Sequence, residues 1–172
     1  MICLGLDLAI RGDYTAAVLF NSDTRLITAA IRLPHGPMAE QARALHPLMA
    51  RADVVAYDRT GLGYVAGEFL SHHRLIPVTI SGGAGISVRK DGVTAGKMGL
   101  IRGLSDAIRS GVKIADNCPG RDDLRSEMAN FCYGQTAGGR VTANARRGHD
   151  DILCAAGLAL IGVLVAAGGV AH

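Results

Sequence analysis

Cysteine motifs and a nucleotide-binding loop are missing from this 172-residue sequence. The four cysteines show no C-x-x-C spacing and no histidine at zinc-ligand spacing, which excludes a zinc finger and favours a reduced, intracellular protein. They are Cys3, Cys118, Cys132 and Cys154. A phosphate loop for ATP is excluded because the stretch from Gly92 to Lys97 has one residue too few between its glycines, and Met98 stands where Ser or Thr is needed.

Lysine and glutamate are also scarce. The chain has 3 Lys against 15 Arg and 3 Glu against 12 Asp, with a formal net charge of +3. Arginine can bind two phosphate oxygens at once, so this composition is compatible with nucleic acid, although GC-rich coding produces the same excess. With 49% apolar residues, the chain is expected to form a single domain, residues 1–172, around a sizeable core.

One long apolar run raises the question of a membrane. The 20 residues from Ile152 to Ala171 carry no charge, which meets the length rule for a membrane span. The run is rich in Ala and Gly, lacks an aromatic belt and a basic flank after it, and begins directly after Asp150 and Asp151. These features favour a helix that is buried on one face against a sheet and capped by the two aspartates.

The hydrophobic pattern predicts one continuous α/β domain. Strands are expected at 2–9, 14–20 and 25–33, joined by turns into an antiparallel meander. Helices are expected at 38–51, 64–73, 97–110 and 121–130, and short apolar runs at 54–57 and 76–80 are typical of buried parallel strands. Residues 81–92 are expected to form a glycine-rich loop, and 131–136 with 140–145 a β-hairpin. This order predicts a ribonuclease H-like fold, with a mixed five-stranded central sheet flanked by helices.

Acidic residues stand at three points of this pattern. Asp7 ends the first strand, Asp58 ends the run 54–57, and the pair Asp150 and Asp151 opens the last helix. Carboxylates at strand ends and at a helix start can converge above a sheet, where they repel one another unless positive charge lies between them. Two divalent metal ions are the usual solution, since they bridge carboxylates and activate water for attack on phosphate. The sequence therefore predicts a metal-dependent nuclease.

Each acid also has a structural explanation. Asp7 could end a turn, Asp58 could form an exposed ion pair with Arg59, and either Asp150 or Asp151 could simply cap the helix. Burial of an acid between two leucines is unfavourable without a partner, and a cap needs only one of the two aspartates. Metal ligation is therefore the favoured interpretation.

Residues near the acids are candidates for supporting roles. Asp13 and His149 are candidates for the shell around the metal ligands or for proton transfer. Four basic residues are candidates for DNA binding. These are Arg89, Lys90, Arg146 and Arg147. Lys97 is expected to be solvated rather than catalytic.

Four segments resemble the nuclease domain of phage large terminase subunits. They are Gly5–Ala9 followed by Gly12–Ala16, Tyr57–Gly63, Leu124–Phe131 with its Glu127, and His149–Leu153. The resemblance spans nearly the whole chain, with the segments in the family's order. It implies a ribonuclease H-like endonuclease that cuts concatemeric viral DNA with two divalent ions, Mg²⁺ or Mn²⁺.

The same resemblance implies site residues and partners. Asp7 would bridge both ions, Asp58 would hold one, and one or both of Asp150 and Asp151 would hold the other. Many relatives have a further acid where this chain has Cys154. The implied partners are double-stranded DNA, an ATPase motor that is separate or truncated, a portal and a small terminase subunit, in the cytoplasm of a bacterial host and without a membrane.

Three alternatives stay open. A Holliday-junction resolvase would use the same fold and acids on branched DNA. A prophage remnant or packaging-assembly module would keep the fold without the activity. The actin-like and sugar-kinase superfamily also begins with G-x-D on a first strand, but it needs two such domains and a second phosphate-binding turn, which the sequence does not show.

Overall fold

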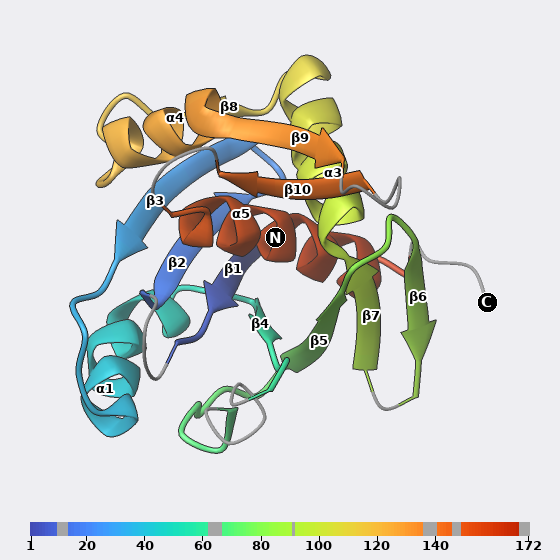
Figure 1. Cartoon of the computed structure of the whole chain (residues 1–172). Coiled ribbons are helices and arrows are strands. Elements are labelled where there is room, and N and C mark those ends of the chain that lie inside the picture. Colours follow the sequence, from blue (N-terminus) through green and yellow to red (C-terminus); the bar gives the residue numbers. More distant parts are fainter. Residues whose placement is uncertain (10–13, 62–66, 91, 136–140, 146–148, 169–172) are drawn as a thin grey trace.

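The computed structural model describes residues 1–9, 14–61, 67–90, 92–135, 141–145 and 149–168, and only the backbone at 132–135 and 141–145. Its centre is a mixed eight-stranded sheet in the order β6-β7-β5-β4-β1-β2-β3-β8 (Figure 1). The strands are β1 (Ile2–Asp7), β2 (Ala16–Asn21), β3 (Leu26–Arg32), β4 (Val54–Asp58), β5 (Leu75–Ser81), β6 (Ile86–Arg89), β7 (Gly92–Gly96) and β8 (Lys113–Ile114). The helices are α1 (Met38–Met49), α3 (Lys97–Arg109), α4 (Arg121–Asn130) and α5 (Asp151–Ala166), and β9 (Phe131–Gln135) pairs with β10 (Val141–Ala145) as a separate hairpin.

The sheet begins with the expected meander and continues with parallel strands. β1, β2 and β3 are antiparallel neighbours, whereas β4, β5 and β7 run parallel to β1. Cys3 pairs with Val54, and Leu6 pairs with Tyr57. Because the two strands run in the same direction and in register, their carboxyl ends meet at one edge of the sheet.

The side chains of β1 alternate between two cores. Leu4 and Leu6 pack on the face that α1 covers, whereas Cys3 lies in the core beneath α5. Gly5 also faces α5, and its backbone lies so close to the helix that a β-carbon would collide with the backbone of Ala155. The small residues of α5 therefore let this apolar helix lie directly on the central strand, as expected for a helix buried against a sheet. Within the described residues, no helix combines the length and apolarity of a membrane span.

The predicted helices at 97–110 and 121–130 and the late hairpin are confirmed to within a few residues, but one local prediction is wrong and another is corrected in part. The expected loop over 81–92 contains β6 and leads into β7, with Ile86 paired to Ala95 and Arg89 to Gly92. Alternation of Ile86 and Val88 with polar neighbours is the period of a strand, and this hairpin, with β8, brings the sheet from five strands to eight.

The helix expected over 64–73 is corrected only at its C-terminal end. Residues 62–66 lie outside the described part, residue 67 is helical, and residues 70–73 are not helical. The imidazole of His72 contacts the carbonyl oxygens of Arg74 at 3.1 Å and Ala52 at 3.0 Å. These contacts hold the chain as a turn that enters β5 directly, so local side-chain bonding wins over helix propensity.

Candidate metal centre

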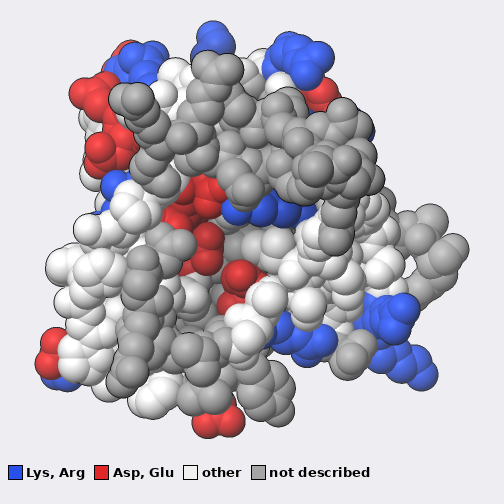
Figure 2. Space-filling view, in the orientation of Figure 1, with Lys and Arg blue, Asp and Glu red and all other residues white. Residues whose placement is uncertain are grey.

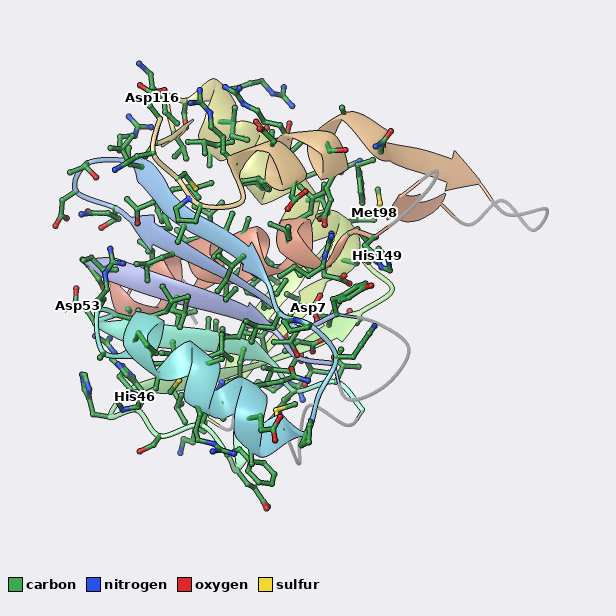
Figure 3. The ribbon with its side chains drawn as sticks, turned by 90° about the vertical axis from the view of Figure 1, so that its left-hand side faces the viewer. Asp7, His46, Asp53, Met98, Asp116 and His149 are labelled. Atoms are coloured by element: carbon green, nitrogen blue, oxygen red, sulfur yellow. The ribbon has the colours of Figure 1, made fainter. Side chains whose placement is uncertain are left out.

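Two of the predicted acids lie side by side at the carboxyl edge of the sheet. Asp7 is the last residue of β1 and Asp58 the last of β4, one residue beyond the paired Leu6 and Tyr57. By strand alternation both carboxylates project to the face that α5 covers, since Ala56, two residues before Asp58, lies in the core beneath that helix. Asp7 and His149 lie at the same end of the molecule, away from Asp53 (Figure 3).

Asp150 joins these acids through a lysine. Nζ of Lys97, the first residue of α3, lies 2.8 Å from Oδ2 of Asp150, and both side chains are largely buried. Burial lowers the pKa of Lys97, but its hydrogen bond to Asp150 and the charges of Asp150 and Asp7 outweigh this effect, so the pKa is raised. The prediction that Lys97 is solvated is therefore wrong. The charges of both Asp7 and Asp150 therefore act on the Lys97 ammonium.

The first turn of α5 lies inside this acidic group. Burial raises the pKa of the Cys154 thiol well above its usual value, and the charges of Asp7, Asp150 and Asp151 raise it further. The thiol is therefore neutral. Cys154 stands where many members of the resembled family have an acid, and here it adds no charge to the group.

The two consecutive aspartates face different partners. Asp150 faces Lys97, whereas the side chain of Asp151 is only 4% exposed and points towards β3 and the segment before α5. Oδ2 of Asp151 lies 3.6 Å from Nδ1 of His149 and 3.8 Å from Nε of Arg32. The start of α5 thus directs Asp150 to the centre of the acidic group and Asp151 to the side of that group.

Asp58 also has a structural function. Its Oδ1 accepts hydrogen bonds from the backbone N–H of Thr60 at 2.7 Å and from the Thr60 hydroxyl. Oγ1 of Thr60 in turn accepts the N–H of Ile80 at 2.8 Å, which ties the ends of β4 and β5 together. The guanidinium of the adjacent Arg59 donates from Nε to Thr79 at 3.1 Å. Asp58 therefore closes a turn while its position keeps it beside Asp7.

Several contacts at this site carry no recognisable signal in the sequence. Arg32 on β3 forms an ion pair with Glu127 on α4, and its guanidinium lies 5.3 Å from the centre of the Tyr14 ring. Tyr14 stacks on His35 at 4.3 Å and meets His149 edge-on at 4.8 Å. Lys97, Arg32 and the residues that contact Arg32 come from separate segments of the sequence, so only the folded structure shows that they lie together.

Of the remaining candidates, Asp13, Arg146 and Arg147 lie outside the described residues. Arg89 and Lys90 are exposed at the β6–β7 turn, and the strand order separates β6 from β1 by three strands. The structure therefore does not bring this basic pair to the acids.

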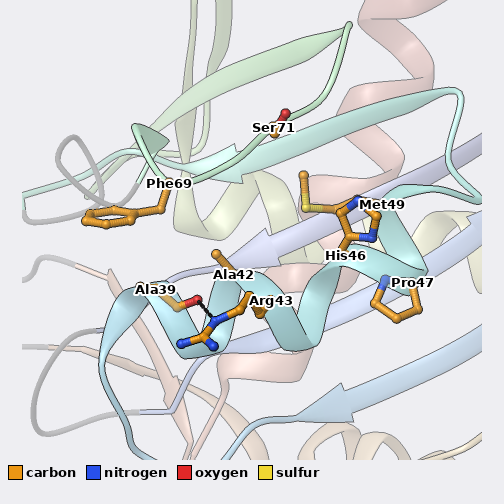
Figure 4. A pocket seen from close by; sticks show the side chains of 8 residues that line it. All are labelled: Ala39, Ala42, Arg43, His46, Pro47, Met49, Phe69 and Ser71. Carbon is orange, nitrogen blue, oxygen red and sulfur yellow. Dashed lines mark hydrogen bonds between the residues drawn. The ribbon is translucent and has the colours of Figure 1, made fainter.

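One face of the molecule has a hollow with acidic surface. Figure 2 shows acidic surface gathered inside a depression in the middle of one face, with basic surface beside it. A different hollow, of about 580 Å³, lies along α1 and is lined by Ala39, Ala42, Arg43, His46, Pro47, Met49, Phe69 and Ser71 (Figure 4). It has no acidic lining residue, and α1 covers the opposite face of the sheet from α5, so it is not part of the acidic site.

The donor chemistry of the acidic group fits a hard divalent cation. Mg²⁺ and Mn²⁺ prefer carboxylate oxygens, which Asp7, Asp58 and Asp150 supply. As the side chains stand, no three Asp, Glu, His or Cys residues among those described are close enough to hold an ion. The ammonium of Lys97 supplies the positive charge at Asp150 instead. An ion held by these carboxylates would therefore require the side chains to move and would compete with Lys97 for Asp150.

No family model matches the sequence, and no curated protein matches it. Solved structures do match. The magnesium-bound large terminase nuclease of the thermophilic phage G20c is 25% identical, with a TM-score of 0.73 over 94% of this chain and 80% of that chain. The Thermus phage P74-26 large terminase nuclease domain is 22% identical, with a TM-score of 0.69 over 92% and 77%.

A more distant match is the manganese-bound large terminase nuclease domain of bacteriophage SPP1, which is 13% identical with a TM-score of 0.59 over 93% of this chain and 85% of that chain. Across such divergent sequences the shared feature is the fold, a mixed sheet with helices on both faces. The chain thus has a ribonuclease H-like fold and resembles the nuclease domains of phage large terminases over nearly its whole length.

Proposed function

We propose that this chain is a metal-dependent DNA endonuclease with its active site at the ends of β1 and β4 and the start of α5. The observation that carries the proposal is the placement of Asp7 and Asp58 at the adjacent ends of two paired strands, with Asp150 ion-paired to Lys97, a lysine whose pKa the charges of Asp150 and Asp7 raise. Like charges brought together in a hollow are unfavourable unless a cation is bound there. The likeness to terminase nucleases that were solved with magnesium and manganese supports the same interpretation.

Three carboxylates would hold two divalent ions, Mg²⁺ or Mn²⁺. Asp7 and Asp58 are neighbours at the sheet edge, and Asp150 faces them across Lys97. We assign Asp150 rather than Asp151 as the ligand from α5, because the carboxylate of Asp151 faces Arg32 and His149. Such ions would supply a Lewis acid and an activated water for hydrolysis of a phosphodiester bond.

Lys97 and His149 would act on the substrate directly, through positive charge and through proton transfer. Lys97 keeps its proton because its pKa is raised, so it presents a positive charge beside a bound phosphate. His149 is half-exposed and lies against Asp151, a position from which its imidazole could accept or release a proton. None of these groups reads a base edge, so cleavage should be largely independent of sequence.

The proposed setting is viral DNA packaging in the cytoplasm of a bacterial host. The likeness to large terminase nucleases supports double-stranded DNA as the substrate. An ATPase motor, a portal and a small terminase subunit are the partners that such a role would require. Metal-dependent hydrolysis of DNA by this domain would not require any of these partners.

Cleavage of supercoiled plasmid tests the proposal. With millimolar Mn²⁺ or Mg²⁺, the wild type should nick and then linearise the plasmid, and EDTA should stop the reaction. Asp7→Asn should lower the rate by at least about 100-fold, as loss of a metal ligand does. Asp53→Asn is the matched control, because Asp53 accepts the N–H of Ile2 at 2.7 Å at the opposite end of β1 and Asn retains an acceptor oxygen. Equal rates for wild type and Asp7→Asn would contradict the assignment.

A non-catalytic packaging module is the second candidate. The observation that favours it is the lack of three suitably close ligands among the described side chains. A folded wild type that shows no cleavage with any divalent ion would support this alternative. Preference for a four-way junction over linear duplex would indicate a resolvase instead.

A further inference from the structure

Helix α5 begins without a capping side chain of its own. Asp150 occupies the N-cap position but makes no side-chain cap hydrogen bond. The first N–H groups of a helix need an acceptor, and a buried helix start without one is costly. Here the acceptor comes from another helix, because Oε2 of Glu127 on α4 receives the N–H of Leu153 at 3.0 Å. A carboxylate at this point also faces the positive end of the helix dipole.

The same glutamate is coupled to the acidic pair through Arg32. Its Oε1 accepts a hydrogen bond from Nη2 of Arg32, whose Nε lies 3.8 Å from Oδ2 of Asp151. The side chains of Glu127 and Asp151 are 6% and 4% exposed, and that of Arg32 is 24% exposed. One guanidinium thus bridges two buried carboxylates from different helices. Removal of one partner from such a group leaves uncompensated buried charge.

This connection determines which way the two consecutive aspartates point. Arg32 holds Asp151 towards β3, while Glu127 holds the backbone of the first turn of α5. With the turn fixed in this way, Asp150 is left facing Lys97. A small rotation or fraying of the turn would move the Asp150 carboxylate away from Asp7 and Asp58, because those two acids are held separately at the ends of β1 and β4.

We infer that Glu127 and Arg32 are positioning residues for the metal-binding carboxylates, acting through the first turn of α5. The inference rests on the proposed function. Neither residue would touch the metal or the DNA. Groups that orient metal ligands from outside typically change metal affinity or activity by about 10- to 100-fold when removed.

The alternative is that the pair only stabilises the fold, and two kinds of variant separate these roles. Glu127→Gln keeps an acceptor oxygen for the Leu153 N–H but loses the charge that pairs with Arg32, whereas Glu127→Ala loses both. Leu124→Ala is the matched control, because Leu124 lies on the same helix and is fully buried in the core. This control should destabilise the packing of α4 while keeping both contacts of the Glu127 carboxylate.

The experiment measures three quantities for each purified variant: the melting temperature, the Mn²⁺ concentration for half-maximal plasmid cleavage, and the hydrogen-exchange rate of the Leu153 amide. We expect Glu127→Gln to raise the half-maximal Mn²⁺ concentration about tenfold and to speed exchange at Leu153, with a larger effect in Glu127→Ala. Arg32→Lys should retain more of the wild-type Mn²⁺ dependence than Arg32→Met. Leu124→Ala should keep the wild-type Mn²⁺ dependence at an equal or greater loss of melting temperature.

Wild-type Mn²⁺ dependence in Glu127→Gln would overturn the inference, and this variant decides the matter if Glu127→Ala fails to fold. The inference would also be overturned if the half-maximal Mn²⁺ concentration rose in step with the loss of melting temperature in every variant, including Leu124→Ala. Wild-type protein that neither cleaves nor gains thermal stability in Mn²⁺ would overturn the proposed function and this inference together. An active wild type with an unaffected Glu127→Gln would overturn only the inference.

Discussion

Nζ of Lys97 lies 2.8 Å from Oδ2 of Asp150, and this contact joins the start of α3 to the start of α5. A divalent ion bound to the Asp150 carboxylate would occupy the place of this ammonium. The charges of Asp150 and Asp7 both raise the pKa of Lys97. Lys97 and a metal ion should therefore compete for Asp150.

Replacement of Lys97 by Met tests this competition. Without divalent ions the variant should lose about 1 to 2 kcal/mol of unfolding free energy, since a largely buried carboxylate loses its partner. The stabilisation by Mn²⁺ should be larger than in the wild type, because no ammonium has to be displaced. Thermal unfolding in EDTA and in Mn²⁺ measures both effects, with Lys113→Met on the exposed edge of β8 as control. An unchanged Mn²⁺ shift would show that Lys97 and the metal do not share a site.

Metal linkage provides a prediction for Asp7. Millimolar Mn²⁺ or Mg²⁺ should raise the melting temperature of the wild type, because an ion that binds only the folded protein stabilises it, by about 2.7 kcal/mol at 100 times its Kd. Asp7→Ala should be as stable as the wild type in EDTA or slightly more stable, since one repelling charge is gone. It should lose the shift in Mn²⁺. A full Mn²⁺ shift in Asp7→Ala, measured by differential scanning fluorimetry, is the contrary result.

The positions of the acids on the fold could be predicted because they depend on local patterns. Asp7 and Asp58 each end a run of strand-forming residues, and parallel pairing of those strands places the two ends together. Asp150 and Asp151 precede a long apolar run, which is a readable helix start. Beyond these signals the pattern fails at 81–92, where glycines suggested a loop although Ile86 and Val88 alternate as in a strand.

The contacts among the site residues could not be predicted in the same way. Arg32 and Glu127 are 95 residues apart, and they meet only because α4 packs near β3. Lys97 follows a glycine-rich segment that resembles an exposed loop, yet α3 begins at that residue and turns its ammonium towards Asp150. Whether Asp150 or Asp151 faces the cleft depends on the rotation of one helical turn, which no spacing in the sequence encodes.

The pH dependence of stability should report on Glu127. Burial raises its pKa above 4.5, although the N–H of Leu153 and the charge of Arg32 lower it. Because the pKa of Glu127 is raised in the folded state, the contribution of Glu127 to stability is present below the pKa of the unfolded state. This contribution is lost as the pH rises through the pKa of the folded state. The unfolding free energy of the wild type should therefore fall relative to that of Glu127→Gln as the pH rises above 4.5. Denaturant titrations at roughly pH 4 to 8 measure this difference, and Glu40→Gln on the exposed start of α1 is the control. A constant difference would contradict the raised pKa.

The exposed basic pair at the β6–β7 turn provides a prediction for DNA binding. Neutralising Arg89 and Lys90 together should weaken binding to every DNA sequence alike. The slope of log affinity against log salt should fall by about 2, because each lost phosphate contact contributes roughly 0.9. Arg43 and Arg51, exposed beside the opposite face of the sheet, are the control pair. Salt titrations with an unchanged slope for the Arg89 and Lys90 variant would place the DNA elsewhere.

The most direct test of the acidic site is an anomalous difference map from crystals soaked in MnCl₂. We expect strong peaks bounded by the carboxylates of Asp7, Asp58 and Asp150, with the Lys97 ammonium moved away from Asp150 and no peak in Asp7→Ala crystals. Asp151 should keep its contact with Arg32 in the soaked wild type. Well-diffracting soaked crystals with no peak at Asp7, or with Mn²⁺ bound only elsewhere on the protein, would show that these acids do not form a metal site.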